Sequence, residues 1–323
     1  MSAIALSCGD PAGIGIEIAL KAWEQLGGAL PFYWIGDPKH LPKGTPHVLI
    51  DEPWEAVDAA RKAMPVLPIK FPRGAEPGKL DPRNAPGVVA AIDRAVADAR
   101  AGHASAVCTL PIHKQALMDG AGFAFPGHTE YLSHLAGGRR VAMMLASPEL
   151  RVVPVTIHIP LSEVPGALSQ QEIEGAIRLA REGLIRDFGI ERPRIAVSGL
   201  NPHAGEGGKI GREESDIIEP ALARLRSEGF LIAGPMSADT MFHAKARAQY
   251  DCAVCMYHDQ ALIPIKTVNF EGGVNVTLGL PFVRTSPDHG TAIDIAGRGI
   301  ADPASLISAL ILAEDMARTR GIS

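Results

Sequence analysis

Apolar runs and amphipathic stretches alternate from one end of the chain to the other. The apolar runs are short and rich in Val, Ile, Leu and Ala, which is typical of strands buried on both faces. They lie at residues 3–8, 106–110, 152–157, 195–200 and 252–257. The amphipathic stretches have helical spacing and lie at residues 17–26, 86–101, 171–188, 213–228 and 303–318. This order predicts βαβ units and a largely parallel sheet with helices on both faces.

The chain has 323 residues, which is usually more than one hydrophobic core accommodates. We therefore expect an α/β protein with two α/β/α subdomains. Residues 65–86 are rich in Pro, Gly and charged side chains, so they are predicted to form a long surface connection.

The formal net charge of -5 argues against a nucleic-acid partner, because a phosphate backbone requires clustered Lys and Arg. No apolar run has the length of a membrane span. The first six residues have no basic segment before their apolar stretch, so they are predicted to be a strand and not a signal peptide. The expected location is the cytoplasm, without a membrane partner.

The cysteines at positions 8, 108, 252 and 255 are predicted to be reduced and buried. Cys252 and Cys255 form a C-x-x-C pair, a spacing found at zinc and redox sites. However, the sequence contains no second pair of this kind, and an apolar strand turns the two side chains to opposite faces. We expect core cysteines here.

Three of the eleven histidines, His158, His203 and His258, follow predicted buried strands. The carboxyl ends of parallel strands share one edge of the sheet, where ligands bind. Three imidazoles at that edge can hold one divalent cation and leave coordination positions open, as a catalytic metal requires. The alternative is three independent loop histidines with polar partners. Their shared position at strand ends favours the metal site.

Two carboxylates accompany these histidines. Asp259 follows His258 directly, and Asp239 follows another apolar run. Either can orient a ligand imidazole or contact a substrate. Helix capping is the alternative for Asp239.

Two regions are candidates for binding an anion. His128 and Thr129 follow a glycine at the predicted start of a helix, although Thr129 is also a suitable helix cap. Lys266, Asn275 and Arg284 lie in or next to an otherwise apolar region. Cations in such surroundings are costly unless they are paired or face a ligand, so these residues indicate a phosphate or carboxylate site. The alternatives are a solvated strand face or a salt bridge.

The glycine-rich loop 9–17 connects the first strand to the first helix. Glycines there allow backbone N–H groups to approach a phosphate at the helix N-terminus. The loop lacks the third glycine of the dinucleotide fingerprint, and a structural turn explains it equally well.

Six motifs together resemble the 4-hydroxythreonine-4-phosphate dehydrogenase family. They are GDPAGIG (9–15), GHTE (127–130), LNPHAGEGG (200–208), YHDQ (257–260), GVNVTLGLP (273–281) and RTSPDHGT (284–291). The similarity extends in the same order from the first strand to the final helix, which makes it far more specific than any single glycine loop. One departure is Ala261, where the family pattern has glycine, and this change removes no functional group.

The resemblance implies an enzyme of pyridoxine 5'-phosphate biosynthesis. It would oxidise 4-phosphooxy-L-threonine at C3 with NAD or NADP, and loss of carbon dioxide would then give 3-amino-2-oxopropyl phosphate. The implied metal, Zn, Mg or Co, is bound by His158, His203 and His258. The implied substrate contacts are His128, Thr129, Lys266, Asn275 and Arg284. Asp239, as acceptor of the hydroxyl proton, and Lys266 are the candidate catalytic residues, with a metal-bound water as the alternative acceptor.

The resemblance also implies a fold like that of isocitrate and isopropylmalate dehydrogenases, which explains the missing nicotinamide fingerprint. The first subdomain would contain residues 1–130 plus 285–323. The second, residues 131–284, would carry the metal ligands and the contacts of a homodimer with a shared active site. The contacts to the nicotinamide are not predicted.

Two other functions are open alternatives. Paralogous dehydrogenases of phosphorylated threonate or erythronate share most of these motifs. A metal-dependent hydrolase or aldolase also uses a three-histidine site with an open position.

Overall fold

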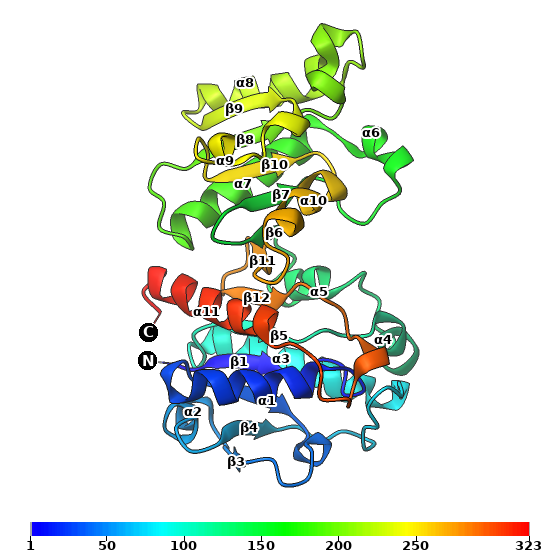
Figure 1. Ribbon diagram of the computed structural model, residues 1–323, viewed down its shortest axis with the longest axis vertical. Coiled ribbons are helices and arrows are strands. Elements are labelled where there is room, and N and C mark those ends of the chain that lie inside the picture. Colours follow the sequence, from blue (N-terminus) through cyan, green and yellow to red (C-terminus); the bar gives the residue numbers. More distant parts are fainter. Residues whose placement is uncertain (1, 323) are drawn as a thin grey trace. The chain divides into compact units, whose positions relative to one another are not determined.

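The computed structural model describes residues 2–322, and the chain folds into two compact units (Figure 1). Unit 1 contains the chain up to Arg139 and from Leu280 onward, and unit 2 is Arg140–Gly279. The predicted boundaries place residues 131–139 and 280–284 in the second subdomain, whereas the structure has them in unit 1. Arg284 is therefore a residue of unit 1.

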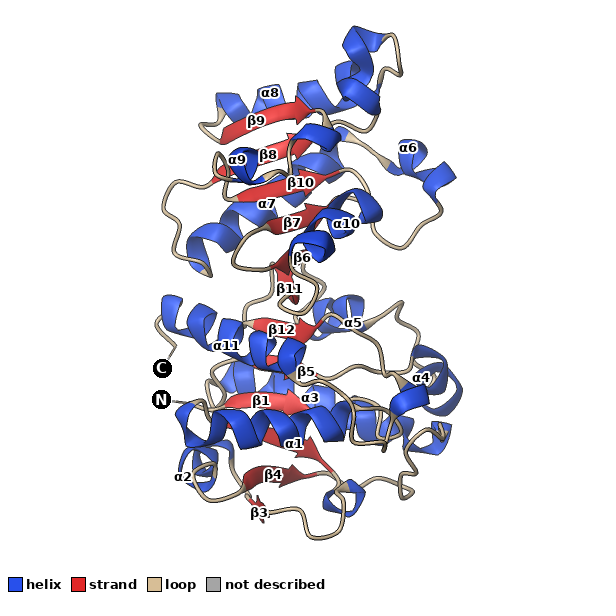
Figure 2. Ribbon diagram, viewed as in Figure 1, coloured by secondary structure: helices blue, strands red, loops and turns tan. Residues whose placement is uncertain are grey.

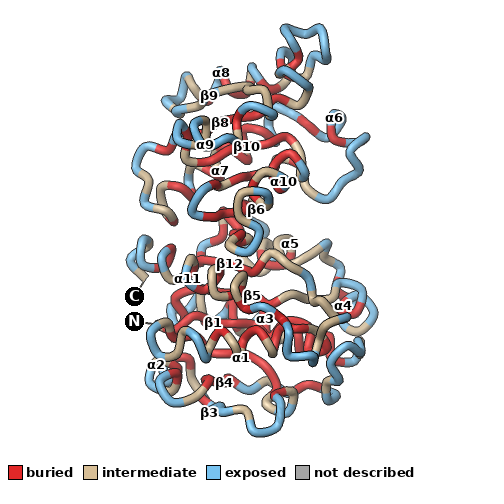
Figure 3. The backbone as a smooth tube through the Cα atoms, viewed as in Figure 1, coloured by how far each residue is buried: buried red, intermediate tan, exposed pale blue. Residues whose placement is uncertain are grey.

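Unit 1 is built on a parallel sheet with the strand order β3-β4-β2-β1-β5-β12. The strands are β1 (Ile4–Ser7), β2 (Phe32–Gly36), β3 (His47–Leu49), β4 (Met64–Pro68), β5 (Val107–Thr109) and β12 (Arg284–Pro287). Strands β1, β2, β5 and β12 are buried along their whole length (Figure 3). Burial on both faces explains why β1, β2 and β5 are continuously apolar or small rather than alternating, whereas β12 begins with the charged Arg284.

Helices cover both faces of this sheet. They are α1 (Gly15–Leu26), α2 (Ala56–Ala59), α3 (Ala85–Ala101), α4 (Lys114–Ala121), α5 (His128–Leu135) and α11 (Ala304–Thr319). Helices α1 and α11 lie on one face and α3 lies on the other (Figure 2). Helix α3 ends at Gly102, which adopts the left-handed backbone that commonly terminates helices.

Unit 2 has a mixed sheet with the strand order β11-β6-β7-β10-β8-β9. The strands are β6 (Ala142–Ala146), β7 (Arg151–Pro154), β8 (Arg194–Ser198), β9 (Leu231–Met236), β10 (Cys252–Cys255) and β11 (Val274–Leu278). Strand β6 is antiparallel to both β11 and β7, and the remaining pairs are parallel. The carboxyl ends of β7, β10 and β8 therefore lie at one edge.

The helices of unit 2 again flank the sheet. They are α6 (Val164–Ala167), α7 (Gln170–Arg186), α8 (Glu219–Ser227), α9 (Ala244–Arg247) and α10 (His258–Val268), and a π-helical turn, Glu214–Ile218, leads into α8. Helix α10 packs on β7 and β10 from the face opposite to α7 (Figure 1). Short 3-10 turns in the two units lie at Gly27–Ala29, Pro38–His40, Pro53–Glu55, Pro82–Asn84, Leu161–Glu163, Pro202–Gly208, Ala238–Thr240 and Ile293–Ile295.

The predicted fold class is confirmed, since both units are α/β with largely parallel sheets. The prediction of a surface connection at residues 65–86 is wrong at its start, because β4 is a mostly buried strand that contains Pro65 and Pro68. On the β3 side, the bonds of β4 use the N–H of Met64 and the carbonyl of Val66, so this side needs no N–H from either proline.

The four cysteines are free and buried, as predicted. Burial raises the pKa of Cys108 and of Cys252 to about 12, so these thiols stay protonated at neutral pH. Within residues 2–322, no helix combines the length and the apolar character that a membrane span needs.

Candidate functional site

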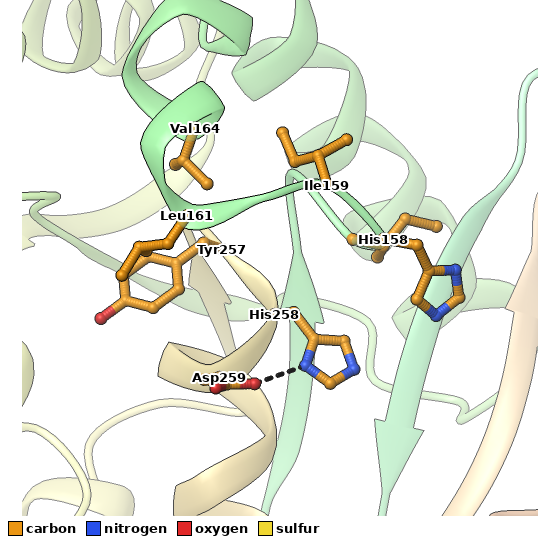
Figure 4. Close-up of a pocket in the computed structure, with 8 residues that line it drawn as sticks. His158, Ile159, Leu161, Val164, Tyr257, His258 and Asp259 are labelled. Atoms are coloured by element: carbon orange, nitrogen blue, oxygen red, sulfur yellow. Dashed lines mark hydrogen bonds and ion pairs between the residues drawn. The ribbon is translucent and has the colours of Figure 1, made fainter.

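Strands β7 and β10 deliver two histidines to the same place. The hydrogen bonding between β7 and β10 continues past the ends of both strands. There Thr156 donates to the carbonyl of Met256 through its N–H (3.2 Å) and its hydroxyl (2.8 Å). His158 and His258 each lie two residues further on. Their rings consequently lie side by side, with centroids 5.8 Å apart (Figure 4).

A carboxylate orients one ring of this pair. The Oδ1 atom of Asp259 lies 2.7 Å from Nδ1 of His258, as the dashed line in Figure 4 shows. A carboxylate in this position fixes the ring with Nδ1 protonated and leaves Nε2 as the nitrogen available to a ligand. His158 is exposed and His258 is half-buried, so both rings can be reached from solvent.

Two adjoining pockets surround the pair, with His258 and Asp259 lining both. The first has a volume of about 290 Å³ and is also lined by His158 and Tyr257. The second, of about 420 Å³, includes Lys266. Lys266 lies eight residues after His258 on α10, which places both side chains on one face of the helix. The structure thus groups Lys266 with His258.

His203 is not grouped with the other two histidines. Among residues 2–322, no set of three or more His, Cys, Asp or Glu side chains is placed to hold a metal ion. His203 lies five residues beyond β8, in the turn Pro202–Gly208, and not directly at the strand end. His158 and His258 can supply two nitrogen ligands to a divalent cation, and Asp259 orients one of the two rings.

Asp239 is exposed and lies beside His203. A hydrogen bond of 2.5 Å from the Ser237 hydroxyl is the main reason why the pKa of Asp239 is lowered, and the proximity of His203 lowers it further. Asp239 is the second residue of the 3-10 turn Ala238–Thr240, whose N-cap is Ser237. The interpretation of Asp239 as a helix cap is therefore wrong.

Gln260, which sequence reasoning missed, joins two of the strand ends. Its Oε1 accepts hydrogen bonds from the Ser198 hydroxyl and from the N–H of Met256, both at 2.7 Å. Its Nε2 donates to the carbonyl of Gly199 at 2.8 Å. The buried amide thus ties the end of β8 to the end of β10, two residues after His258. The sequence does contain an indication of this role, because Gln260 is a polar residue among the buried positions of α10, which include Ala261 and Ile265.

In unit 1, Arg284 begins β12 and is buried, with 3% of its surface exposed. Its Nη2 donates to the Thr109 hydroxyl on the neighbouring strand β5 at 2.7 Å. Burial lowers the pKa of Arg284 to about 10, so the guanidinium remains charged at neutral pH. A buried cation that persists in this way is well suited to an anionic ligand.

His128 lies near this guanidinium, at the first position of α5. Burial, together with the charge of Arg284, lowers the pKa of His128 to about 3, so the imidazole is neutral. Its Nε2 is buried and has no hydrogen-bond partner within residues 2–322. Thr129 is the second residue of α5, and the N-cap is Gly127, so the interpretation of Thr129 as the helix cap is wrong.

Asn275 lies on β11 in unit 2. Its Oδ1 is buried, and no residue in the described range 2–322 donates a hydrogen bond to it. A buried acceptor in this state is costly unless a ligand or water satisfies it. The structure therefore leaves Asn275 available to a ligand.

The glycine loop 9–15 is closed by the protein itself. A Cβ on Gly13 would lie 2.7 Å from the carbonyl oxygen of Thr291, and a Cβ on Gly9 would lie 2.5 Å from that of Pro111. The N–H of Ile14, at the N-terminus of α1, donates to the same Thr291 oxygen (3.0 Å). These contacts favour the structural interpretation of the loop over a phosphate site.

The low pKa of His128 predicts a specific dependence of stability on pH. Because the unfolded chain protonates this imidazole near its ordinary pKa of 6.5 and the folded chain does so near 3, the free energy of unfolding falls as the pH drops below 6.5. We expect H128Q to remove about 1.4 kcal/mol per pH unit of this slope between pH 6 and 4. Urea unfolding at several pH values measures it, and H47Q, at an exposed histidine of unit 1, is the control. Equal slopes for H128Q and the parent chain would contradict a neutral imidazole with a buried Nε2.

The fold defines a class of protein: two α/β units with largely parallel sheets, in which candidate ligand groups such as His158 and His258 follow the carboxyl ends of strands. The chain belongs to the family described as pyridoxal phosphate biosynthetic protein PdxA, which matches residues 29–313. This confirms the resemblance found in the six motifs.

Individual relatives match over almost the entire chain. The 4-hydroxythreonine-4-phosphate dehydrogenase of Ruegeria sp. (strain TM1040) is 58% identical over 317 residues, covering 98% of this chain and 97% of the relative. That of Paracoccus denitrificans (strain Pd 1222) is 59% identical over 321 residues, covering 98% of each. The crystal structure of 4-hydroxythreonine-4-phosphate dehydrogenase from Klebsiella pneumoniae is 41% identical, with a TM-score of 0.90 and 98% of each chain covered.

Proposed function

We propose that the protein is a dehydrogenase that oxidises 4-phosphooxy-L-threonine at C3 with NAD or NADP, in pyridoxine 5'-phosphate biosynthesis. The oxidised product loses its carboxylate as carbon dioxide and becomes 3-amino-2-oxopropyl phosphate. The observation that carries this proposal is the identity of 58% and 59% to two relatives of that name over 98% of the chain. The proposed location is the cytoplasm, and the proposed assembly is a homodimer whose active site is shared between subunits.

His158, His203 and His258 are the proposed ligands of a divalent cation, Zn, Mg or Co. The paired rings of His158 and His258 and the carboxylate behind His258 support this set. When bound, the metal supplies a positive charge next to the C3 oxygen, which favours both oxidation and decarboxylation. Asp259 holds the ring of His258 in the orientation that this binding needs.

Charged and polar side chains are proposed to hold the phosphate and the rest of the substrate. The proposed contacts are His128, Thr129, Lys266, Asn275 and Arg284. Arg284 offers a planar, permanently charged donor, and His128 remains neutral at its side, so the two groups do not repel each other. Fixing the phosphate in this way positions C3 for loss of hydride.

Asp239 is the proposed acceptor of the proton from the C3 hydroxyl. Its lowered pKa keeps the carboxylate ionised at neutral pH, and it lies next to His203, one of the proposed ligands. Lys266 is the second candidate for a catalytic role, since it lines a pocket together with His258. Bound NAD or NADP would supply the acceptor for the hydride of C3, so the two electrons of the C–H bond would reduce the cofactor.

The test is an assay of the purified, metal-loaded protein with NAD and with NADP against three substrates. These are 4-phosphooxy-L-threonine and the 4-phosphates of threonate and erythronate. We expect kcat/KM to be about 10-fold or more higher for the amino acid, because the two relatives at 58% and 59% identity are named for that activity. A preference for either sugar acid would identify a paralogous dehydrogenase. Phosphate release without nicotinamide reduction would identify a hydrolase.

A further inference from the structure

The turn that carries His203 has an unusual backbone. Residues 203–207 all adopt left-handed conformations, with φ of 52° at His203, 51° at Ala204 and 42° at Glu206. These three are not glycine, and each costs about 1–2 kcal/mol in this conformation. Such a run persists only where surrounding groups hold it in place.

The carboxylate of Glu214 is the main group that holds the start of this turn. Its Oε1 accepts hydrogen bonds from the N–H groups of Leu200 (2.8 Å) and Asn201 (2.7 Å). Its Oε2 accepts one from the Asn201 side chain at 3.0 Å. Glu214 is only 6% exposed. A buried carboxylate that accepts three hydrogen bonds holds these donors in place, because hydrogen bonds to a charged acceptor are short and strong.

The middle of the turn packs against the same carboxylate. A Cβ on Gly205 would lie 2.6 Å from Oε2 of Glu214, and a Cβ on Gly199 would lie 3.0 Å from Oε1. The chain therefore wraps around the carboxylate from strand β8 to the middle of the turn. Glu214 itself begins the π-helical turn Glu214–Ile218, a geometry that is frequent at functional sites.

We propose that Glu214 is a positioning residue, which locks the left-handed turn and thereby determines where the His203 imidazole is presented. This inference rests on the proposed function, in which His203 is a metal ligand. Glu214 acts through the backbone of Leu200 and Asn201.

The test measures Zn²⁺ affinity of the metal-free protein by calorimetry, with Zn²⁺ alone as the probe. E214A removes all three acceptor contacts, whereas E214Q keeps an oxygen for the two backbone N–H groups. We expect E214A to weaken Zn²⁺ binding about 10-fold or more and E214Q to stay within about threefold of the parent chain. Hydrogen exchange at the amides of Leu200 and Asn201 should accelerate in E214A and not in E214Q. E219A, at an exposed glutamate on α8 that pairs with Arg226, is the control.

The outcomes distinguish a failure of the positioning role of Glu214 from a failure of the proposed metal-ligand set. Parent-like Zn²⁺ affinity in E214A, together with a loss in H203A, would refute the positioning role and leave the ligand set intact. Equal losses in E214A and E214Q would also refute it, because the backbone hydrogen bonds would then not be the cause. Unchanged affinity in H203A would refute the ligand set itself. If E214A does not fold, E214D replaces it, since the shorter side chain withdraws the carboxylate from both amides.

Discussion

Replacing His258 with alanine is expected to abolish stoichiometric binding of a divalent cation and to lower kcat about 10³-fold. The ring is one of two imidazoles with centroids 5.8 Å apart, and its only side-chain hydrogen-bond partner within residues 2–322 is Asp259. Because the ring is half-buried and makes no other hydrogen bond in that range, the stability should change by less than about 0.5 kcal/mol. Metal analysis, steady-state turnover and thermal unfolding measure the three effects.

Two further variants, D259N and H47A, provide a smaller expected effect and a control. D259N keeps the shape of the side chain but weakens its hold on Nδ1 of His258, so it should cost about 10-fold in metal affinity and not eliminate binding. H47A, at an exposed histidine on the edge strand β3, should leave metal content and turnover unchanged. Full metal content and parent-like kcat in H258A would rule out the ligand role of His258.

The second large effect is expected at Arg284. Removing its guanidinium in R284A should raise KM for the phosphorylated substrate about 10- to 100-fold, since charge-assisted hydrogen bonds contribute about 1.5–3 kcal/mol each. The KM for the nicotinamide should change much less. Initial rates with each substrate varied in turn give both constants. An equal rise in the two values would contradict a specific role in holding the phosphate.

Two further variants separate charge from packing at this position. Arg284 is buried, so alanine also leaves a cavity, whereas R284M fills most of the space without the charge. If the guanidinium matters for the ligand, R284M and R284A should raise KM alike, and R284K should recover part of the loss. R83A, at an exposed arginine paired with Asp81, is the control for a surface charge.

The sequence was sufficient to predict the α/β class, because strands buried on both faces and helices with one apolar face leave clear periodic patterns. It was also sufficient to group His158 with His258. His158 lies four residues past the end of β7, and His258 lies three residues past the end of β10. The two strands are parallel neighbours, and the hydrogen bond from Thr156 to Met256 keeps the segments that follow them in register. For His203 the same rule was not enough, since the path of a five-residue excursion depends on a backbone conformation that residue types alone do not reveal.

Other features depended on tertiary contacts. Gln260 and Glu214 are ordinary polar residues in sequence, and their roles appear only when their hydrogen bonds to distant backbone groups are known. The glycines of loop 9–15 illustrate the reverse problem. Their pattern is compatible with a phosphate site, but the close approach of Thr291 and Pro111 shows that they are needed for packing.

Because all four thiols are buried, the rate at which each one reacts with an alkylating reagent measures local opening of the structure around it. Cys8 and Cys108 lie in unit 1, and Cys252 and Cys255 lie in unit 2. A maleimide can react with a given cysteine only when the surrounding strands separate, and burial keeps each sulfur protonated until that happens. Timed alkylation followed by peptide mapping can therefore rank how readily each half of the molecule loosens, without any introduced label.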